Sequence, residues 1–364
     1  MPFFKTPAPH IFGNNAVSVM MVTVMLATVP ALLAQIFYFG WGSLIQVILA
    51  ILFALIAEAA ILILREKPIK STLFDGSAAL TGLLIGLSLP SIAPWWITFT
   101  AVMFAIVFAK HLYGGLGYNP FNPAMVGYVL VLISFPLHMT SWLPASSLLS
   151  EGVSFADSFW LIFTGHSISG IDIEALRTGI DGFTMATPLD TVKTDLASGF
   201  MASESIAKSI FTEVRFIGTV GNGWWVINLM YLFGGLVLIY RNVIGWQIPL
   251  SMLATVVITS FIFNSVAADI HTPTSLHLFS GATMFAAFFI ATDPVSAATT
   301  PRGRIYYGIG IGALIYIIRT FGGYPDAVAF AVLLMNMAAP TIDHFTAPIV
   351  YGHKPNKTAN RGDL

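Results

Sequence analysis

Long apolar runs, separated by short polar stretches, occupy most of the chain. Each run is long enough to cross a membrane or to enter it partly. We therefore predict ten transmembrane helices, near residues 17–38, 44–64, 77–90, 95–109, 122–137, 223–241, 245–264, 279–292, 305–320 and 326–345. The pattern predicts an all-α integral membrane protein in three parts. These are an N-terminal five-helix repeat, a polar loop region, and a C-terminal five-helix repeat with a tail, over residues 1–137, 138–222 and 223–364.

Two of the runs are shorter than the roughly 20 residues that a membrane helix needs. The runs at 77–90 and 279–292 stop at or just before Pro90 and Pro294, and proline disfavours a continuing helix because it lacks an N–H group. Glycine-containing segments open both runs at similar places in the two groups of five. Glycine and proline are common in membrane helices anyway, but features that recur in order favour a true repeat. Because each repeat crosses the membrane five times, an odd number, the second repeat starts on the opposite side and must be inverted relative to the first. The third and eighth helices are predicted to be broken.

The composition agrees with a chain that faces lipid. Of 364 residues, 56% are hydrophobic and 9% are charged, whereas soluble domains carry roughly 25% charged residues. The net charge of −1 gives no electrostatic reason to expect nucleic-acid binding. The absence of cysteine excludes disulfides and cysteine-ligated iron–sulfur clusters within this chain.

Basic residues indicate the orientation, because they gather on the cytoplasmic side of membrane helices. With a cytoplasmic N-terminus, only Arg319 near a short outer loop falls on the wrong side. The inner segments then hold Lys5, Arg65, Lys67, Lys70, Lys110, Arg241, Arg302, Arg304, Lys354, Lys357 and Arg361. We therefore predict that both termini are cytoplasmic and that the region 138–222 lies on the far side of the membrane.

The far-side region contains a short motif that resembles a flavin attachment site. Residues 181–187 read Asp-Gly-Phe-Thr-Met-Ala-Thr. Flavin transferases attach FMN through its phosphate to the last threonine of a pattern that runs Asp, two variable residues, Ser or Thr, Gly, Ala, Thr. Asp181, Thr184, Ala186 and the acceptor Thr187 match this pattern, and Met185 stands in place of glycine.

The alternative interpretation of this motif is a plain turn, because aspartate and glycine are turn residues that proline often follows. Pro188 comes directly after Thr187 and favours an extended backbone there. A threonine hydroxyl is a weak nucleophile, so attachment needs an activated flavin donor and a separate enzyme. The setting in a far-side loop between membrane helices favours the flavin interpretation.

A second segment repeats part of the same pattern. Ser280–Thr283 reads Ser-Gly-Ala-Thr, but His277 stands where the pattern has aspartate. The segment also enters an apolar run, where a soluble transferase would have poor access. We therefore expect it to form part of a helix that packs closely through small residues.

Four polar residues in or near the helices are candidates for an ion path. A carboxylate in hydrocarbon is costly and is a functional candidate by default, which applies to Glu58 in the second helix. The other three are Asp293, Asn119 and Asn336. The alternatives are a hydrogen-bonded structural Glu58 and, for the asparagines, bonding across helices. No catalytic residue and no metal site is predicted.

One short helix is predicted in the far-side region. The run from Ser203 to Lys208 is typical of a helix start, with Ser203 as the N-cap. Glu204 and Lys208 are four residues apart and would share one face.

Taken together, the chain resembles a family of membrane proteins found in two related systems, the Rnf ion-translocating oxidoreductases (their RnfD component) and the sodium-pumping NADH:quinone reductases (their NqrB component). The resemblance covers essentially the whole chain and includes the Thr187 motif and the segments 280–294 and 322–326. It implies FMN bound covalently at Thr187, and related proteins of the family can hold a noncovalent flavin such as riboflavin.

The resemblance also implies partners and a location. These are the Rnf subunits A, B, C, E and G, a flavin transferase and membrane lipid, in a bacterial inner membrane. The complex moves electrons between NADH and ferredoxin and pumps Na⁺ or H⁺. NADH is expected on another subunit, because no Rossmann glycine fingerprint is present here.

We therefore expect an electron-relay subunit of a redox-driven translocase. One alternative is a stand-alone urea-type channel or carrier, which inverted five-helix repeats would also suit. Another is a purely structural membrane anchor for partner proteins. Thr187 discriminates among them, because neither a pore nor an anchor has an evident use for a flavin ester.

Overall fold

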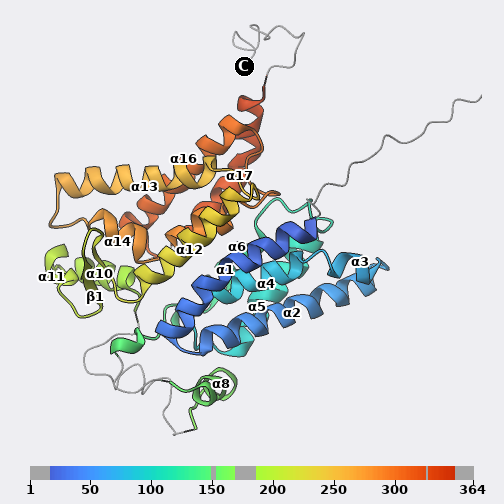
Figure 1. Cartoon of the computed structure of the whole chain (residues 1–364), viewed down its shortest axis with the longest axis horizontal. Coiled ribbons are helices and arrows are strands. Elements are labelled where there is room, and N and C mark those ends of the chain that lie inside the picture. Colours follow the sequence, from blue (N-terminus) through green and yellow to red (C-terminus); the bar gives the residue numbers. More distant parts are fainter. Residues whose placement is uncertain (1–16, 149–152, 169–185, 325–326, 349–364) are drawn as a thin grey trace, which may run out of the picture.

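The computed structural model describes residues 17–148, 153–168, 186–324 and 327–348. Its two helical groups lie beside each other, with α1 along α12 and α6 along α17 (Figure 1). The first group contains α1 (Val17–Phe39), α2 (Gly42–Leu64), α3 (Ile69–Leu73), α4 (Ser77–Ser88), α5 (Trp95–Met103), the π-helix η1 (Phe104–His111) and α6 (Pro123–Ser134). The second contains α12 (Trp224–Tyr240), α13 (Gln247–Val266), α14 (Thr274–Phe279), α15 (Thr283–Phe285), the π-helix η3 (Ala286–Ile290), α16 (Pro301–Phe321) and α17 (Val328–Thr346).

Shorter elements lie at one end of the bundle, which we call the α10 end (Figure 1). They are α7 (Pro136–Met139), the 3-10 helix η2 (Ser146–Leu148), α8 (Phe155–Thr164), α10 (Pro188–Ala197), α11 (Ala202–Ile206), β1 (Phe211–Val214) and β2 (Gly218–Gly221). The two strands pair antiparallel, with Phe211 opposite Gly221. The opposite end of the bundle carries α3 and is called the α3 end.

The predicted all-α membrane class is confirmed, and every predicted helix overlaps a helix of the structure. Among the described residues, α1, α2, α13 and α17 are long and apolar enough to cross a membrane. The predicted eighth helix, residues 279–292, begins at the last residue of α14, continues through a non-helical break at residues 280–282, and then forms the continuous α15 and η3. The inverted repeat and the division into three regions stay predictions.

Helix α2 buries polar residues and exposes apolar ones, as a membrane helix does. Its buried face carries Gln46 and Glu58, whereas Ile48, Ile56 and Ile63 on the other side are exposed. Large apolar side chains that point away from the protein are stable in hydrocarbon but not in water. The distribution therefore places this face of α2 against lipid.

Glycines bring neighbouring helices into backbone contact. A Cβ atom at Gly82 of α4 would collide with the backbone of Ala50 in α2, and Gly86 meets the same helix one turn later. Gly308 and Gly312 of α16 approach the backbone of α13 in the same way. Small residues four apart allow such close packing, which supplies the van der Waals contact that holds membrane helices together.

A buried asparagine satisfies the backbone at the break between α14 and α15. The Asn228 side-chain nitrogen donates to the carbonyl oxygens of Phe279 at 3.2 Å and Gly281 at 2.8 Å. Its oxygen accepts from the Met284 N–H at 3.3 Å. Unpaired backbone groups are costly away from water, so Asn228 makes this interruption possible.

Two further amide side chains donate to backbone carbonyls at other helix ends. Gln35 of α1 donates to the carbonyl of Leu87, in the last turn of α4, at 3.4 Å. Asn122 caps α6 and also donates to the carbonyl of Ile290, the last residue of η3, at 3.3 Å. Both helix ends are thereby tied to a neighbouring element.

The predicted details of the helix near Ser203 are wrong. Helix α11 begins before Ser203, with Met201 as its cap residue, and Glu204 Oε2 accepts from the Met201 N–H at 2.9 Å. Lys208 does not share a helical face with Glu204, because α11 ends earlier. It forms an ion pair with Asp195 of α10 at 2.6 Å. The packing of α10 beside α11, which lies beyond local sequence, decides this pairing.

We predict that Gly82→Ala destabilises the bundle by about 1–3 kcal/mol, the usual cost of overpacking, because the new methyl group meets the backbone of α2. The thermal unfolding midpoint of the detergent-solubilised protein should fall. Gly323→Ala is the matched control, since nothing lies within 4 Å of its added Cβ. Equal midpoints for the two variants would contradict close α2–α4 packing.

Candidate functional site

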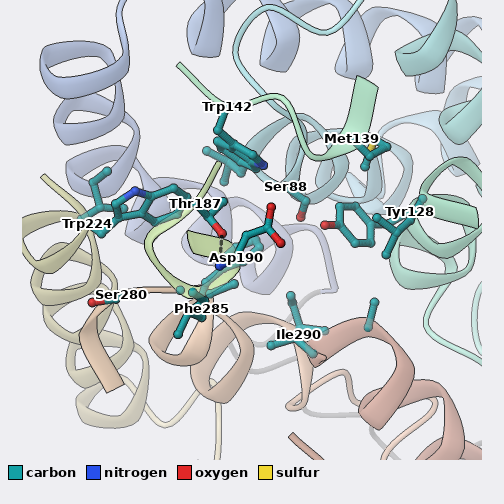
Figure 2. Close-up of a pocket in the computed structure, with 18 of the residues that line it drawn as sticks. Ser88, Tyr128, Met139, Trp142, Thr187, Asp190, Trp224, Ser280, Phe285 and Ile290 are labelled. Carbon is teal, nitrogen blue, oxygen red and sulfur yellow. Dashed lines mark hydrogen bonds between the residues drawn. The ribbon is translucent and has the colours of Figure 1, made fainter. Parts of the chain in front are cut away.

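A cavity at the α10 end lies between the two helical groups, and we call it the Thr187 cavity (Figure 2). It holds about 980 Å³ of space between atoms, its open mouth included. Its walls come from both groups and from the region between them. They include Ser88, Tyr128, Met139, Trp142, Thr187, Asp190, Trp224, Ser280, Phe285 and Ile290.

Thr187 is the N-cap of α10 and lines this cavity. Its Oγ accepts from the Asp190 N–H at 3.2 Å. The backbone is extended, with φ −67° and ψ 158°, as expected for a residue that precedes Pro188. The hydroxyl proton of Thr187 has no acceptor among the described residues, so the oxygen is available toward the cavity. The other two predicted motif residues, Asp181 and Thr184, lie outside the described residues.

Aromatic rings form much of the cavity wall. The rings of Trp142 and Trp224 are 5.2 Å apart, and those of Tyr231 and Phe285 are 4.7 Å apart. Such rings offer apolar faces and edges to a planar aromatic ligand. The cavity therefore combines the Thr187 hydroxyl with surfaces suited to a flat ring system.

Asp190 is the ionisable residue that sequence reasoning missed. Its carboxylate points toward the side of the cavity formed by Ser88 and Tyr128 (Figure 2). Burial raises the pKa of Asp190, and the positive charge of Lys193 opposes this rise in part. The available signal was its place three residues after Thr187, which also fits an ordinary acidic residue in a first helical turn.

The Lys193 side chain is bound by backbone carbonyls beyond α10. Its Nζ donates to the carbonyl oxygens of Ile318 at 3.3 Å and Tyr324 at 3.0 Å. Burial lowers the pKa of Lys193, and the Asp190 carboxylate partly counteracts the effect. The lysine thus ties α10 to the end of α16, and Asp190 forms no ion pair within 4 Å among the described residues.

The prediction for the second Ser-Gly-Ala-Thr segment is wrong in part. Ser280, Gly281 and Ala282 form the break between α14 and α15 and line the Thr187 cavity. Ser280 Oγ accepts from the Gly221 N–H at 2.7 Å. The small residues therefore let the chain turn beside the cavity, and only Thr283 begins a helix.

A second cavity lies toward the α3 end, and we call it the Lys110 cavity. It holds about 920 Å³ of space between atoms, open parts included. Lys110, Asn119, Asn122 and Asp293 contribute polar groups to its wall. Asn119 and Asp293 are two of the four predicted ion-path residues. Lys110 is a cavity residue that the sequence interpretation did not single out.

Glu58 lies behind Lys110. Its Oε1 is 2.6 Å from Lys110 Nζ and 3.2 Å from His111 Nε2, and the Glu58 and Lys110 side chains are 0% and 2% exposed. Lys110 also donates to Ser77 Oγ at 2.7 Å. The second oxygen of Glu58 has no hydrogen-bond partner among the described residues. The carboxylate is therefore held in a buried ion pair beside the cavity.

The Asp293 and Asn336 side chains form hydrogen bonds with neighbouring residues. Asp293 Oδ2 accepts from Ser296 Oγ at 2.6 Å. In the amide orientation that satisfies both of its ends, Asn336 donates to Tyr307 Oη at 2.6 Å and to Ser296 O at 3.2 Å, and accepts from Asn122 N at 3.0 Å. Asn336 thus joins the turn after η3 to α6, α16 and α17.

Comparison with known proteins gives full-length similarity. Residues 5–352 match the NQR2, RnfD, RnfE family. The chain is 54% identical over 354 residues to the D component of the ion-translocating oxidoreductase complex of Aliivibrio salmonicida, covering 97% of this chain and 99% of that protein. The protein of the same name from Aeromonas hydrophila is 53% identical over 345 residues, or 95% and 97% of the two chains. That of Vibrio cholerae is 48% identical over 353 residues, or 97% and 100%.

We predict that Glu58→Gln destabilises the protein by about 3–5 kcal/mol, because it leaves the buried Lys110 ammonium without its countercharge. Adding Lys110→Met to this variant should recover part of the loss, since the unpaired charge is then removed. Thermal midpoints of the two single variants and the double variant measure the coupling. Additive losses would show that the pair does not stabilise the fold.

Proposed function

The chain belongs to the NQR2, RnfD, RnfE family, and from this premise we propose that it is a membrane subunit of an ion-translocating oxidoreductase complex. We further propose that it relays electrons through FMN esterified to Thr187. The transfer runs between NADH and ferredoxin and is coupled to translocation of Na⁺ or H⁺. The observation that carries the proposal is the Thr187 hydroxyl at the wall of an aromatic cavity, where its proton has no acceptor among the described residues.

The residues present fit such a group. Thr187 begins a ten-residue helix, and the N-terminus of a helix favours a negatively charged group such as a phosphate ester. Trp142, Trp224 and Phe285 offer apolar surface to the ring system. Bound FMN supplies the capacity to accept and release electrons. The chain's own residues hold it, exclude water from its ring and set the charge around it.

The proposed ion path runs by the Lys110 cavity. Asp293 and Asn119 present oxygen atoms, the ligands that hard cations such as Na⁺ prefer. Helix α4 borders both cavities, with Ser88 at the Thr187 cavity and Leu84 at the Lys110 cavity. The α15–η3 helix also borders both cavities, with Phe285 at the Thr187 cavity and Phe288 at the Lys110 cavity. These broken helices are the proposed element whose two arrangements link electron and ion transfer.

The remaining proposals concern location and partners. We place the protein in a bacterial inner membrane with both termini cytoplasmic and the α10 end periplasmic. Its partners are the subunits A, B, C, E and G, and a flavin transferase modifies Thr187. A noncovalent flavin such as riboflavin is proposed on the family resemblance alone. In support of the orientation, Arg65, Lys67 and Lys70 follow α2 at the α3 end.

We predict that Thr187→Ala abolishes covalent flavin. The wild-type chain is co-expressed with the transferase, denatured and run on a gel, where it should fluoresce under ultraviolet light and carry the added mass of FMN less water. The variant should be dark because the acceptor oxygen is gone. Thr194→Ala, at an exposed position of the same helix, is the matched control and should stay fluorescent.

A second control is Thr283→Val, which tests the other Ser-Gly-Ala-Thr segment and should also leave the band fluorescent. A dark wild-type band in the presence of an active transferase would overturn the flavin proposal. The urea-type channel would then be tested by solute flux into liposomes.

The orientation can be tested because the chain has no cysteine. Thr194→Cys in α10 and Lys70→Cys in α3, both at exposed positions, place single thiols at opposite ends. A membrane-impermeant maleimide added to intact cells with a permeable outer membrane should label only the first. The second should react after the inner membrane is opened. The reverse pattern would invert the proposed topology.

A further inference from the structure

The Thr187 cavity contains one carboxylate among the described residues that line it, and its position is fixed by the same turn that presents the attachment hydroxyl. The Asp190 N–H donates to Thr187 Oγ at 3.2 Å, so the two residues share the first turn of α10. The Asp190 side chain lines the cavity and points into it (Figure 2). Any group esterified to Thr187 therefore begins within one helical turn of this carboxylate.

The carboxylate of Asp190 has no hydrogen-bond donor and no ion-pair partner within the part of the chain that the structure describes. The cation nearest in sequence, Lys193, is engaged by the carbonyls of Ile318 and Tyr324. Buried or half-buried carboxylates are normally paired. An unpaired carboxylate is free to gain and lose a proton without breaking a contact of the fold.

Among the described residues, the other titratable groups that line the cavity or lie behind its wall are tyrosines and one buried cation. Tyr128 of α6, Tyr231 of α12 and Tyr324 line the cavity, and neutral phenols exert no net charge. Arg319 of α16 lies behind Gly281, where an added Cβ would be 3.0 Å from its Nη2. It is bonded to the carbonyl of His277 and to Thr283 Oγ1, at 2.8 Å and 2.9 Å.

We propose, resting on the proposed flavin at Thr187, that Asp190 is a proton-exchanging residue that couples the charge state of the cavity to proton uptake. When a reduced electron carrier of a partner subunit passes an electron to the flavin proposed at Thr187, Asp190–COO⁻ takes up H⁺ from water at the cavity mouth and becomes Asp190–COOH. When the electron leaves, the proton returns to water. One electron and one proton thus enter and leave together, and no bond of the chain breaks except the O–H bond of this carboxyl.

The physical reason is mutual repulsion. Negative charge beside a carboxylate favours its protonated form, and by reciprocity a protonated carboxyl favours the added electron. Burial already raises the pKa of Asp190 from its ordinary value. A phosphate ester on Thr187 adds a negative charge on the same helical turn and raises this pKa further.

The test is a redox titration of the purified, flavin-loaded protein over a range of pH. The flavin ring itself takes up protons on reduction, so a pH dependence common to all variants is expected. In the wild type, Asp190 should add a further pH-dependent segment, in which the potential falls more steeply as pH rises through the pKa of its carboxyl. Asp190→Asn carries a neutral side chain at every pH. Its potential should match that of the wild type at low pH and should lack this added segment at higher pH.

Two further variants sharpen the result. Asp190→Glu retains a carboxyl group and should keep a pH-dependent segment. Glu213→Gln removes one negative charge at an exposed position of β1 and should titrate like the wild type. Infrared difference spectra provide a second readout, in which reduction should produce a protonated-carboxyl band that Asp190→Asn lacks.

The outcomes separate the two proposals. A fluorescent Asp190→Asn protein whose potential depends on pH as in the wild type would overturn the role of Asp190 and leave the flavin proposal intact. A wild-type chain that carries no flavin despite an active transferase would overturn the proposed function itself. Equal thermal midpoints of the variants and the wild type would show that any difference in reduction potential does not come from misfolding.

Discussion

Helix interruptions inside a membrane protein are possible only if other groups bind the exposed backbone, because lipid offers no hydrogen bonds. This constraint explains the buried amides of the present fold. Asn228 bonds the break between α14 and α15, Asn122 reaches the end of η3, and Gln35 reaches the last turn of α4. Each of these three bonds joins an amide to the backbone of an element other than its own. The interruptions are thus built into the packing between helices.

The interruptions in turn create the two cavities. Because α4 and η3 stop short, residues such as Ser88 and Ile290 border open space rather than further helix. The same two helices line both the Thr187 cavity and the Lys110 cavity. A movement of either helix at one cavity would therefore affect wall residues of the other only a few positions away. This arrangement gives a physical basis for the proposed link between electron transfer at one end of the bundle and ion movement at the other.

The charges are distributed unequally between the cavities. At the Lys110 cavity the cation is paired with Glu58 behind it, and breaking that pair would leave a buried charge. At the Thr187 cavity, Asp190 has no such partner among the described residues, because the carbonyls of α16 and the following turn engage Lys193. The first group is suited to holding the fold, and the second to changing its protonation state.

The sequence alone determined the helical spans, the lipid-facing class and the Thr187 motif, because apolar runs and short motifs are local patterns. Only the tertiary structure decided which polar groups meet. Glu58 and Lys110 are 52 residues apart in sequence, so the hydrophobic periodicity of a single helix cannot predict that they pair. Likewise, Ser280 and Asp190 lie at one cavity only because α10 packs against the break before α15. Side-chain partners depend on contacts between distant segments, whereas helix formation in a membrane depends mainly on the residues of the helix itself.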